Sequence, residues 1–267
     1  MTPPASTANF RGWKDLRLLA RQVYYEQMTF WRNPIGAVFT VGFSVVFLVL
    51  LSSADGNSKV PGLDIHYSQY YTGAFAAYGV MSACFNMLTI TLVVRRETGL
   101  LKRLRLSPLP TWAMIAGLIV NALVISLAQV VLLLAIGRLA YHVQIPSDLP
   151  ALLLTLVVGV VCFTSLGLAA HTLVPNQEAA GPMTSIVFFV LLFLSGLWYA
   201  IPAGSGLAKF SAYFPVRHML LATVAPFIPH VGSAAWAWHD LLVMALWGAG
   251  GIIVAARRFR FEPRRAG

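Results

Sequence analysis

The sequence is poor in charged residues, which form only 10% of its 267 positions, whereas hydrophobic residues form 58%. Soluble domains contain about 25% charged residues, so a water-soluble globular protein is not expected. The hydrophobic residues occur in continuous runs of about 20, the length that a helix needs to cross a bilayer. They do not alternate with polar residues as in a membrane β-barrel. The composition therefore predicts an all-α, multi-pass membrane protein.

Residues that carry catalytic chemistry are few or unsuitably spaced. Cys84 and Cys162 lie inside hydrophobic runs and so predict no structural disulfide. The six histidines follow no zinc-binding spacing, and the sequence contains neither a G-x-x-x-x-G-K-[ST] phosphate loop nor a G-x-S-x-G nucleophile motif. His239 and Asp240 could form an acid–base pair, but the neighbouring tryptophans favour an anchoring role at the membrane interface. We therefore expect no catalytic, metal or cofactor site in this chain.

The hydrophobic runs predict six membrane-spanning helices. A short polar turn, VPNQE at 174–178, separates the fourth run from the fifth. Residues 201–237, between the fifth and sixth runs, are only partly apolar and are interrupted by four prolines. This interruption favours short interfacial helices on the outer side over another span. Within a single domain of residues 1–267, the predicted spans are 35–53, 70–94, 111–137, 150–173, 179–200 and 238–256.

Basic residues cluster in three segments between and beside the spans. The N-terminal segment, the loop after the second span and the C-terminal tail contain five Lys or Arg residues each, which is 15 of the 19 in the chain. With six spans, these segments share one side of the membrane, and such an excess marks the cytoplasmic side. The pattern predicts two cytoplasmic termini and a role in membrane topology, not a nucleic-acid partner. Arg outnumbers Lys 15 to 4, as in GC-rich bacteria, so we expect the bacterial cytoplasmic membrane.

Residues 10–30 precede the first span and predict an amphipathic helix that lies on the membrane surface. A helical wheel separates three apolar from three basic side chains: Leu16, Leu19 and Val23 on one side, and Lys14, Arg17 and Arg21 nearly opposite. The following motif FWRNP (30–34) places a proline at the start of the next helix. This segment is therefore predicted to lead into the first span along the interface.

The segment RRETGLLKRLRLSPLP (95–110) joins the second and third spans. A helical wheel places three leucines and an acid on one arc and two basic residues on the other: Leu100, Leu101, Leu104 and Glu97, against Lys102 and Arg103. Two prolines then end the helical pattern. The segment predicts a short helix over 95–108 that inserts leucines into a cleft of a partner and keeps its charges at the rim. The alternative is a purely topological anchor, for which scattered basic residues would suffice.

The order of these features resembles the permease of ABC type-2 exporters, and above all its daunorubicin-resistance-like drug-efflux branch. The features that match are R-R-E-T-G, L-x-x-L and S-P-L between the second and third of six spans, LSGLWYAIP (194–202) at the end of the fifth, and FPVRHML (214–220) in the interrupted segment. Together with the amphipathic lead-in helix, they extend the resemblance over nearly the whole chain.

The resemblance implies that residues 95–108 are a coupling helix that docks into a groove of a separate ATPase subunit, and that the helix 10–30 also contacts this ATPase. It implies that ATP and Mg²⁺ bind to the ATPase and not to this chain. A second permease, identical or paralogous, is the other implied protein partner. The implied coupling residues are Arg96, Glu97, Gly99, Leu100, Lys102, Leu104 and Arg105.

In this family, spans two and five line the export path, which assigns five residues to it: Phe85, Asn86, Phe189, Phe193 and Tyr199. An aromatic path without charges suits a lipophilic or amphipathic substrate such as a drug, antibiotic, lipid or polyketide. The alternatives are a polysaccharide or glycolipid exporter of the same architecture, a membrane-embedded lipid-modifying enzyme and a proton-coupled transporter. The missing catalytic constellation disfavours the enzyme, and the absence of acidic residues clearly at mid-membrane depth disfavours proton coupling.

Overall fold

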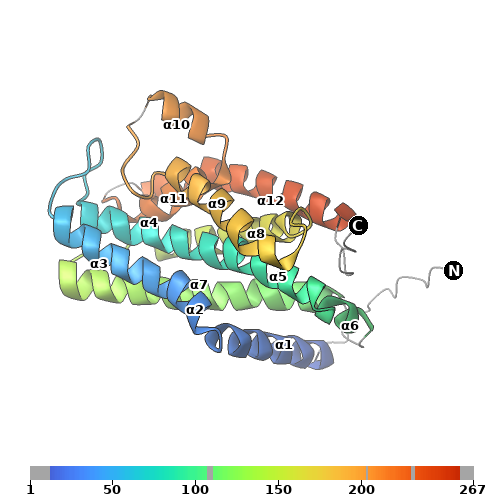
Figure 1. Cartoon of the computed structure of the whole chain (residues 1–267). Coiled ribbons are helices and arrows are strands. Elements are labelled where there is room, and N and C mark those ends of the chain that lie inside the picture. The colour runs from blue at the N-terminus through green and yellow to red at the C-terminus, as the bar shows by residue number, and fades with distance from the viewer. Residues whose placement is uncertain (1–12, 107–110, 203, 230–231, 259–267) are drawn as a thin grey trace.

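The computed structural model describes residues 13–106, 111–202, 204–229 and 232–258, and every regular element in them is a helix (Figure 1). Six stretches of these residues are long and apolar enough to cross a membrane, which confirms the predicted all-α fold with six spans. They are Pro34–Asp55, Tyr67–Glu97, Trp112–Tyr141, Leu149–Ala170, Gln177–Ser195 and Gly232–Arg258.

The first two spans are each built from three helical pieces, with a π-helical turn in the middle. Span one joins α2 (Pro34–Ala37), η1 (Val38–Gly42) and α3 (Phe43–Asp55), and span two joins α4 (Tyr67–Met81), η2 (Ser82–Met87) and α5 (Leu88–Glu97). The other spans are α7 (Thr111–Tyr141), α8 (Leu149–Ala170), α9 (Gln177–Ser195) and η4 (Gly232–Trp236) followed by α12 (Trp238–Arg258). The short or flanking helices are α1 (Trp13–Trp31), α6 (Leu100–Leu106), α10 (Gly206–Ser211), α11 (Pro215–Val224) and η3 (Ala225–Phe227).

The bundle has two distinct ends, which Figure 1 shows at right and left. The end formed by α1, α6, residues 171–176 and the last turn of α12 is here called the basic end, because the three basic segments adjoin it. The opposite end contains residues 56–66, residues 142–148 and the segment with α10 and α11. The predicted short helices between spans five and six are therefore confirmed.

Span two lies at the centre of the bundle, since residues 68–81 of α4 are all buried and pack against α3, α7, α8 and α11. Apolar burial drives helix association weakly in lipid, so close fit and polar contacts matter more than in water. Gln129 of α7 supplies both: its Nε2 donates to Ser44 Oγ of α3 at 2.5 Å, and its amide fills the space beside Gly79 of α4. One buried amide therefore joins the first three spans.

Small residues bring α8 and α12 together. Gly248 and Gly251 of α12 lie against Cys162 and Ser165 of α8, and Ser165 Oγ donates to the Gly248 carbonyl at 3.0 Å. A Cβ atom on Gly251 would lie only 2.9 Å from the carbonyl carbon of Ser165. The two backbones approach this closely because neither helix carries a large side chain at the crossing.

Span five is shorter than the predicted 179–200. The helix α9 ends at Ser195 because Gly196 has a φ of 89° and takes the left-handed conformation that stops a helix. Trp198 and Tyr199 therefore follow the helix instead of belonging to it. The ring of Trp198 folds back onto span one, where it meets Phe47 edge-on at a centroid distance of 5.1 Å.

Replacing Gly251 by Ala is expected to destabilise the bundle by about 1–3 kcal/mol, because an overpacked side chain against rigid backbone forces the helices apart. The matched control is Gly250→Ala, one residue away, where nothing lies within 4 Å of the new Cβ. Thermal unfolding of both purified variants in one detergent should give a lowered midpoint for Gly251→Ala only. Equal midpoints would contradict the close crossing of α8 and α12.

Candidate functional site

The basic end connects span two to α6 through a two-residue turn. Glu97 is the last residue of α5, and Gly99 has a φ of 71°, where any residue with a side chain is strained. The Gly99 N–H donates to the Arg96 carbonyl at 3.0 Å, and the Gly99 carbonyl accepts from the Arg103 N–H of α6 at 3.1 Å. Gly99 thus closes one helix and opens the next, which places α6 directly at the end of span two.

The guanidinium group of Arg96, at the end of α5, is fully buried. Its Nη1 donates to the His171 carbonyl at 3.0 Å, and its Nη2 donates to the carbonyls of Val174 and Pro175 at 2.9 and 3.2 Å. These carbonyls belong to the turn after α8, next to the helix C-terminus with its partial negative charge. Arg96 therefore fixes the turn between spans four and five to the end of span two.

These contacts change the interpretation of Arg96 and Glu97. The predicted helix over 95–108 is two elements, and both residues end α5 before the Gly99 turn instead of lying in α6. The guanidinium N–H groups of Arg96 donate to oxygen atoms of this same chain, and one of these oxygens is Glu97 Oε1 at 2.8 Å. Because its guanidinium has no exposed surface, Arg96 positions the site and does not present a charge to a partner.

The residues of α6 divide between the bundle and its surface. Leu101 is fully buried against a cluster that includes Leu92 and Met114, although the helical wheel placed it with the leucines of the partner-binding arc. Leu100 is 41% exposed and Lys102 is also exposed. Two further predicted coupling residues, Leu104 and Arg105, lie in α6, but their side chains are outside the described part of the structure. The helix therefore packs through Leu101 and exposes Leu100 and Lys102.

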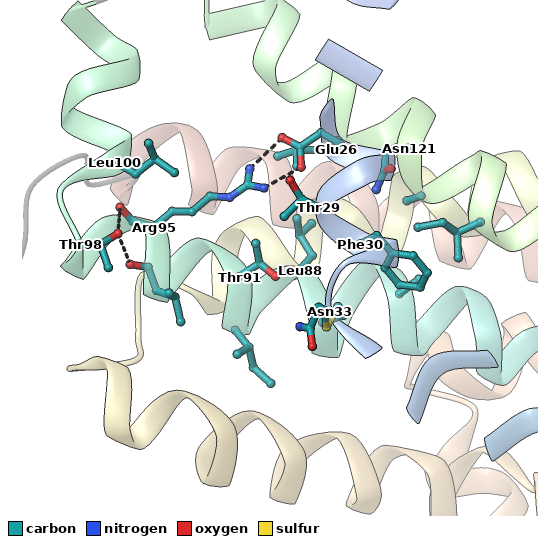
Figure 2. A pocket seen from close by; sticks show the side chains of 17 residues that line it. Glu26, Thr29, Phe30, Asn33, Leu88, Thr91, Arg95, Thr98, Leu100 and Asn121 are labelled. Atoms are coloured by element: carbon teal, nitrogen blue, oxygen red, sulfur yellow. Dashed lines mark hydrogen bonds and ion pairs between the residues drawn. The ribbon is translucent and has the colours of Figure 1, made fainter. Parts of the chain in front are cut away.

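A bidentate ion pair joins α1 to α5. Arg95 Nη1 and Nη2 donate to the two carboxylate oxygens of Glu26 at 2.8 and 2.7 Å (Figure 2). Only 11% of the Arg95 side chain and 7% of the Glu26 side chain are exposed. Gln22 Nε2 also donates to Glu26 Oε1 at 2.9 Å. Such a paired, planar geometry is among the stronger charged contacts in proteins, so it fixes the orientation of α1 against span two.

The amphipathic pattern predicted for α1 is present, but its apolar side faces protein. Leu19 and Val23 are half-buried, whereas Arg17 and Arg21 are exposed. The helix packs along α7, where Gln27 Nε2 donates to the Asn121 carbonyl at 3.2 Å. Part of this apolar side therefore contacts α7, and the position of α1 along the membrane interface stays a prediction. Of the other two predicted residues, Leu16 is 54% exposed, and the side chain of Lys14 is outside the described part.

Glu26 is not among the residues predicted for the site. On a helical wheel it falls on the same side of α1 as Leu19 and Val23. An acidic residue on the apolar side of a helix requires an internal cation, because an unpaired buried charge is costly. That signal identifies Glu26 as a site residue, but it does not identify Arg95, which is 69 positions away.

A cavity of about 370 Å³ lies beside the ion pair, between α1, α5 and α7 (Figure 2). Its lining is mainly apolar, with hydroxyl and amide groups spread around it. The residues labelled in Figure 2 are Glu26, Thr29, Phe30, Asn33, Leu88, Thr91, Arg95, Thr98, Leu100 and Asn121. The wall of the cavity includes Thr98, in the turn before α6, and Leu100, the first residue of α6. The shape of the cavity therefore depends on the position of α6.

The five residues predicted for an export path differ in their exposure. Phe85 and Asn86 lie in η2, where Phe85 is buried and Asn86 is half-buried. Phe189 and Phe193 are 46% and 56% exposed on α9, and Tyr199 is 42% exposed beyond its end. Their role in an export path stays a prediction.

The chain matches a family model described as ABC-2 type transporter over residues 18–227, from α1 to the end of η3. It is 24% identical over 204 residues to the probable multidrug ABC transporter permease YbhR of Escherichia coli K12, which covers 74% of this chain and 54% of YbhR. The chain thus spans about half the length of that relative.

A second relative is similar over most of both chains. The putative transport permease YvfS of Bacillus subtilis 168 is 20% identical over 240 residues, which cover 86% of this chain and 91% of YvfS. The family match includes the two helices of the basic end, α1 and α6, and five of the six spans. The chain belongs to the ABC-2 type transporter family.

Proposed function

We propose that the protein is the permease subunit of an ATP-driven ABC exporter that moves a lipophilic or amphipathic substrate out across the bacterial cytoplasmic membrane. The basic end faces the cytoplasm together with both termini. A separate ATPase subunit, which binds ATP and Mg²⁺, docks on α6 and on α1. Two permeases, identical or paralogous, pair with two ATPase subunits to complete the transporter.

The observation that carries this proposal is the continuous connection from α6 into four other elements. The Gly99 turn joins α6 to span two, Arg96 joins span two to the turn between α8 and α9, and Arg95 joins it to α1. A movement imposed on α6 therefore displaces span two, the ends of spans four and five, and α1 together. A permease driven by a separate motor subunit needs such a connection, and an anchor for topology does not.

The substrate class follows from the surfaces that the spans provide. The walls of the cavity at the basic end are mainly apolar, and its two charges, Glu26 and Arg95, neutralise each other. The exposed face of α9 carries the aromatic residues Phe189 and Phe193. Apolar walls with few polar groups favour lipophilic molecules, and for this reason we prefer such a substrate to a polysaccharide.

The orientation can be tested by labelling cysteines in intact cells. Asn57→Cys, in the loop between spans one and two, should react with a membrane-impermeant maleimide, because that loop lies at the end opposite the basic segments. Arg264→Cys, in the basic tail, should react only after the cells are opened. The native cysteines, Cys84 and Cys162, are buried and give a low background. Labelling of Arg264→Cys from outside would overturn the orientation.

The link between α1 and span two can be tested by exchanging its charges. Glu26→Gln and Arg95→Gln should each reduce export and substrate-stimulated ATP hydrolysis, since removing one partner of a buried ion pair costs about 3–5 kcal/mol. The double variant Glu26→Arg, Arg95→Glu should recover part of both activities. Arg21→Gln, on the exposed side of α1, is the matched control. If both single variants export at the wild-type rate, α1 is not coupled through this pair.

Docking on α6 can be tested by shortening two of its leucines. Leu104→Ala and Leu100→Ala should weaken co-purification with the ATPase subunit, because a fully covered leucine contributes about 1.5–3 kcal/mol. Leu139→Ala removes the same atoms from a side chain that is 83% exposed at the far end of α7, and it should have no effect. Glu97→Ala is unsuitable, since it also disturbs Arg96. Equal ATPase binding by all three variants would assign the basic loop to topology alone.

A further inference from the structure

A histidine and an aspartate meet at the end of the bundle opposite α6. His218 of α11 is buried, and its Nε2 lies 2.8 Å from the backbone carbonyl of Ala212, the residue after α10. Its other ring nitrogen, Nδ1, lies 2.6 Å from Oδ1 of Asp240, in the first turn of α12. The imidazole is therefore held from both sides by oxygen atoms of different elements.

These two contacts determine what occupies the space between His218 and Asp240. A backbone carbonyl only accepts hydrogen bonds, so Nε2 must carry a proton. In a neutral imidazole Nδ1 is then an unprotonated acceptor, and it faces a carboxylate oxygen at 2.6 Å. Two acceptors at this distance repel each other unless a proton lies between them. A metal ion that holds each ligand atom at about 2.0–2.2 Å can replace this proton once the two atoms separate to about 3 Å.

A third ligand group lies next to this pair. The ring of His239 is centred 5.6 Å from that of His218, and one ligand atom from each of His218, His239 and Asp240 lies within 4.8 Å of the other two. A zinc ion holds nitrogen and oxygen ligands at about 2.0–2.2 Å, so the three ligand atoms must move closer together to bind one, and His239 is exposed and free of core packing. The contact from Nε2 to the Ala212 carbonyl matches the hydrogen bond that usually orients a metal-binding histidine.

We propose that His218, His239 and Asp240 form a binding site for a divalent transition metal ion, with Zn²⁺ as the best fit. When the metal binds, Nδ1 of His218 exchanges its proton for a bond to the ion, and the proton leaves to solvent. Two imidazoles and one carboxylate are a typical zinc set with one open position for water. This site does not depend on the proposed transport function.

The charged groups at and near the three ligands influence which metal ions the site favours. The charge of Arg217 acts on His218 and disfavours a cation there. The site therefore contains one carboxylate and a nearby positive group. Mg²⁺ and Ca²⁺ require several oxygen ligands, so they are poor candidates, whereas Zn²⁺ gains from its strong bonds to imidazole.

A metal ion at this position would connect three parts of the chain. It would join α11 to the first turn of α12. The hydrogen bond to the Ala212 carbonyl would extend this connection to the end of α10. The segment between spans five and six would then be fixed to the bundle at the end opposite the one that carries α6.

The test is metal binding by the full chain, purified in detergent and stripped of metal with a chelator. Equilibrium dialysis against Zn²⁺ should give one ion per chain, and Co²⁺ should give the visible absorption of a tetrahedral site. His239→Ala, which changes an exposed side chain, should weaken Zn²⁺ binding by about tenfold or more. The same substitution should leave the metal-free unfolding midpoint unchanged. His218→Gln and Asp240→Asn should abolish binding.

The matched control is His142→Asn, which removes an exposed histidine at the same end of the bundle and keeps a residue that tolerates its positive φ of 55°. It should bind Zn²⁺ like the wild type. Two results would overturn the proposal. One is no saturable Zn²⁺ binding by the wild type, in which case a proton alone holds His218 to Asp240. The other is equal binding by wild type and His239→Ala.

Discussion

The basic end of the bundle depends on the burial of one guanidinium group, that of Arg96, among the carbonyls that follow α8. A buried turn within or near the membrane has little water to satisfy its backbone carbonyls, so an internal donor must do so. Arg96 reaches three of these carbonyls and pairs with Glu97. A buried charge is tolerated only when its donors are satisfied in this way, and the contacts that satisfy it also join spans two, four and five.

The side chain of the neighbouring residue Arg95 points to another side of α5 and has a different partner. Consecutive residues on a helix point about 100° apart, so the two arginines leave α5 on different sides. Arg95 pairs with Glu26 of α1, whereas Arg96 enters the turn between α8 and α9. The end of span two is consequently a junction between the two flanks of the bundle, and α6 extends from that junction after a turn of two residues. A short helix in this position can move the spans only as a connected group.

In the middle of the bundle, close packing replaces charged contacts. Residues 68–81 of span two are all buried, and their packing includes close approaches at glycines, the amides of Gln69 and Gln129, and stacked aromatic rings. Charged contacts of the described residues lie at the two ends: the arginine pairs at the basic end, and Lys59–Asp64 and His218–Asp240 at the other. An apolar middle between charged ends suits a helix bundle that crosses a bilayer.

The number of spans, their approximate positions, the helices before span one and after span two, and the short helices after span five all follow from the sequence. These features depend on local patterns: the length of an apolar run, the spacing of leucines and the positions of prolines. The end of span five was predicted five residues too late, although Gly196 is of the type that commonly closes a helix.

The direction and partner of each charged side chain were decided only by the tertiary structure. Arg95 and Arg96 are adjacent in the sequence and chemically identical, yet one pairs with an acid 69 positions away and the other with carbonyls 75 to 79 positions away. Backbone carbonyls are common to all residues and leave no mark in a sequence pattern. The meeting of His218 with Asp240, 22 positions apart on separate helices, has the same origin. Sequence determines which helices form because that choice is local, whereas the helix crossing determines which charges meet.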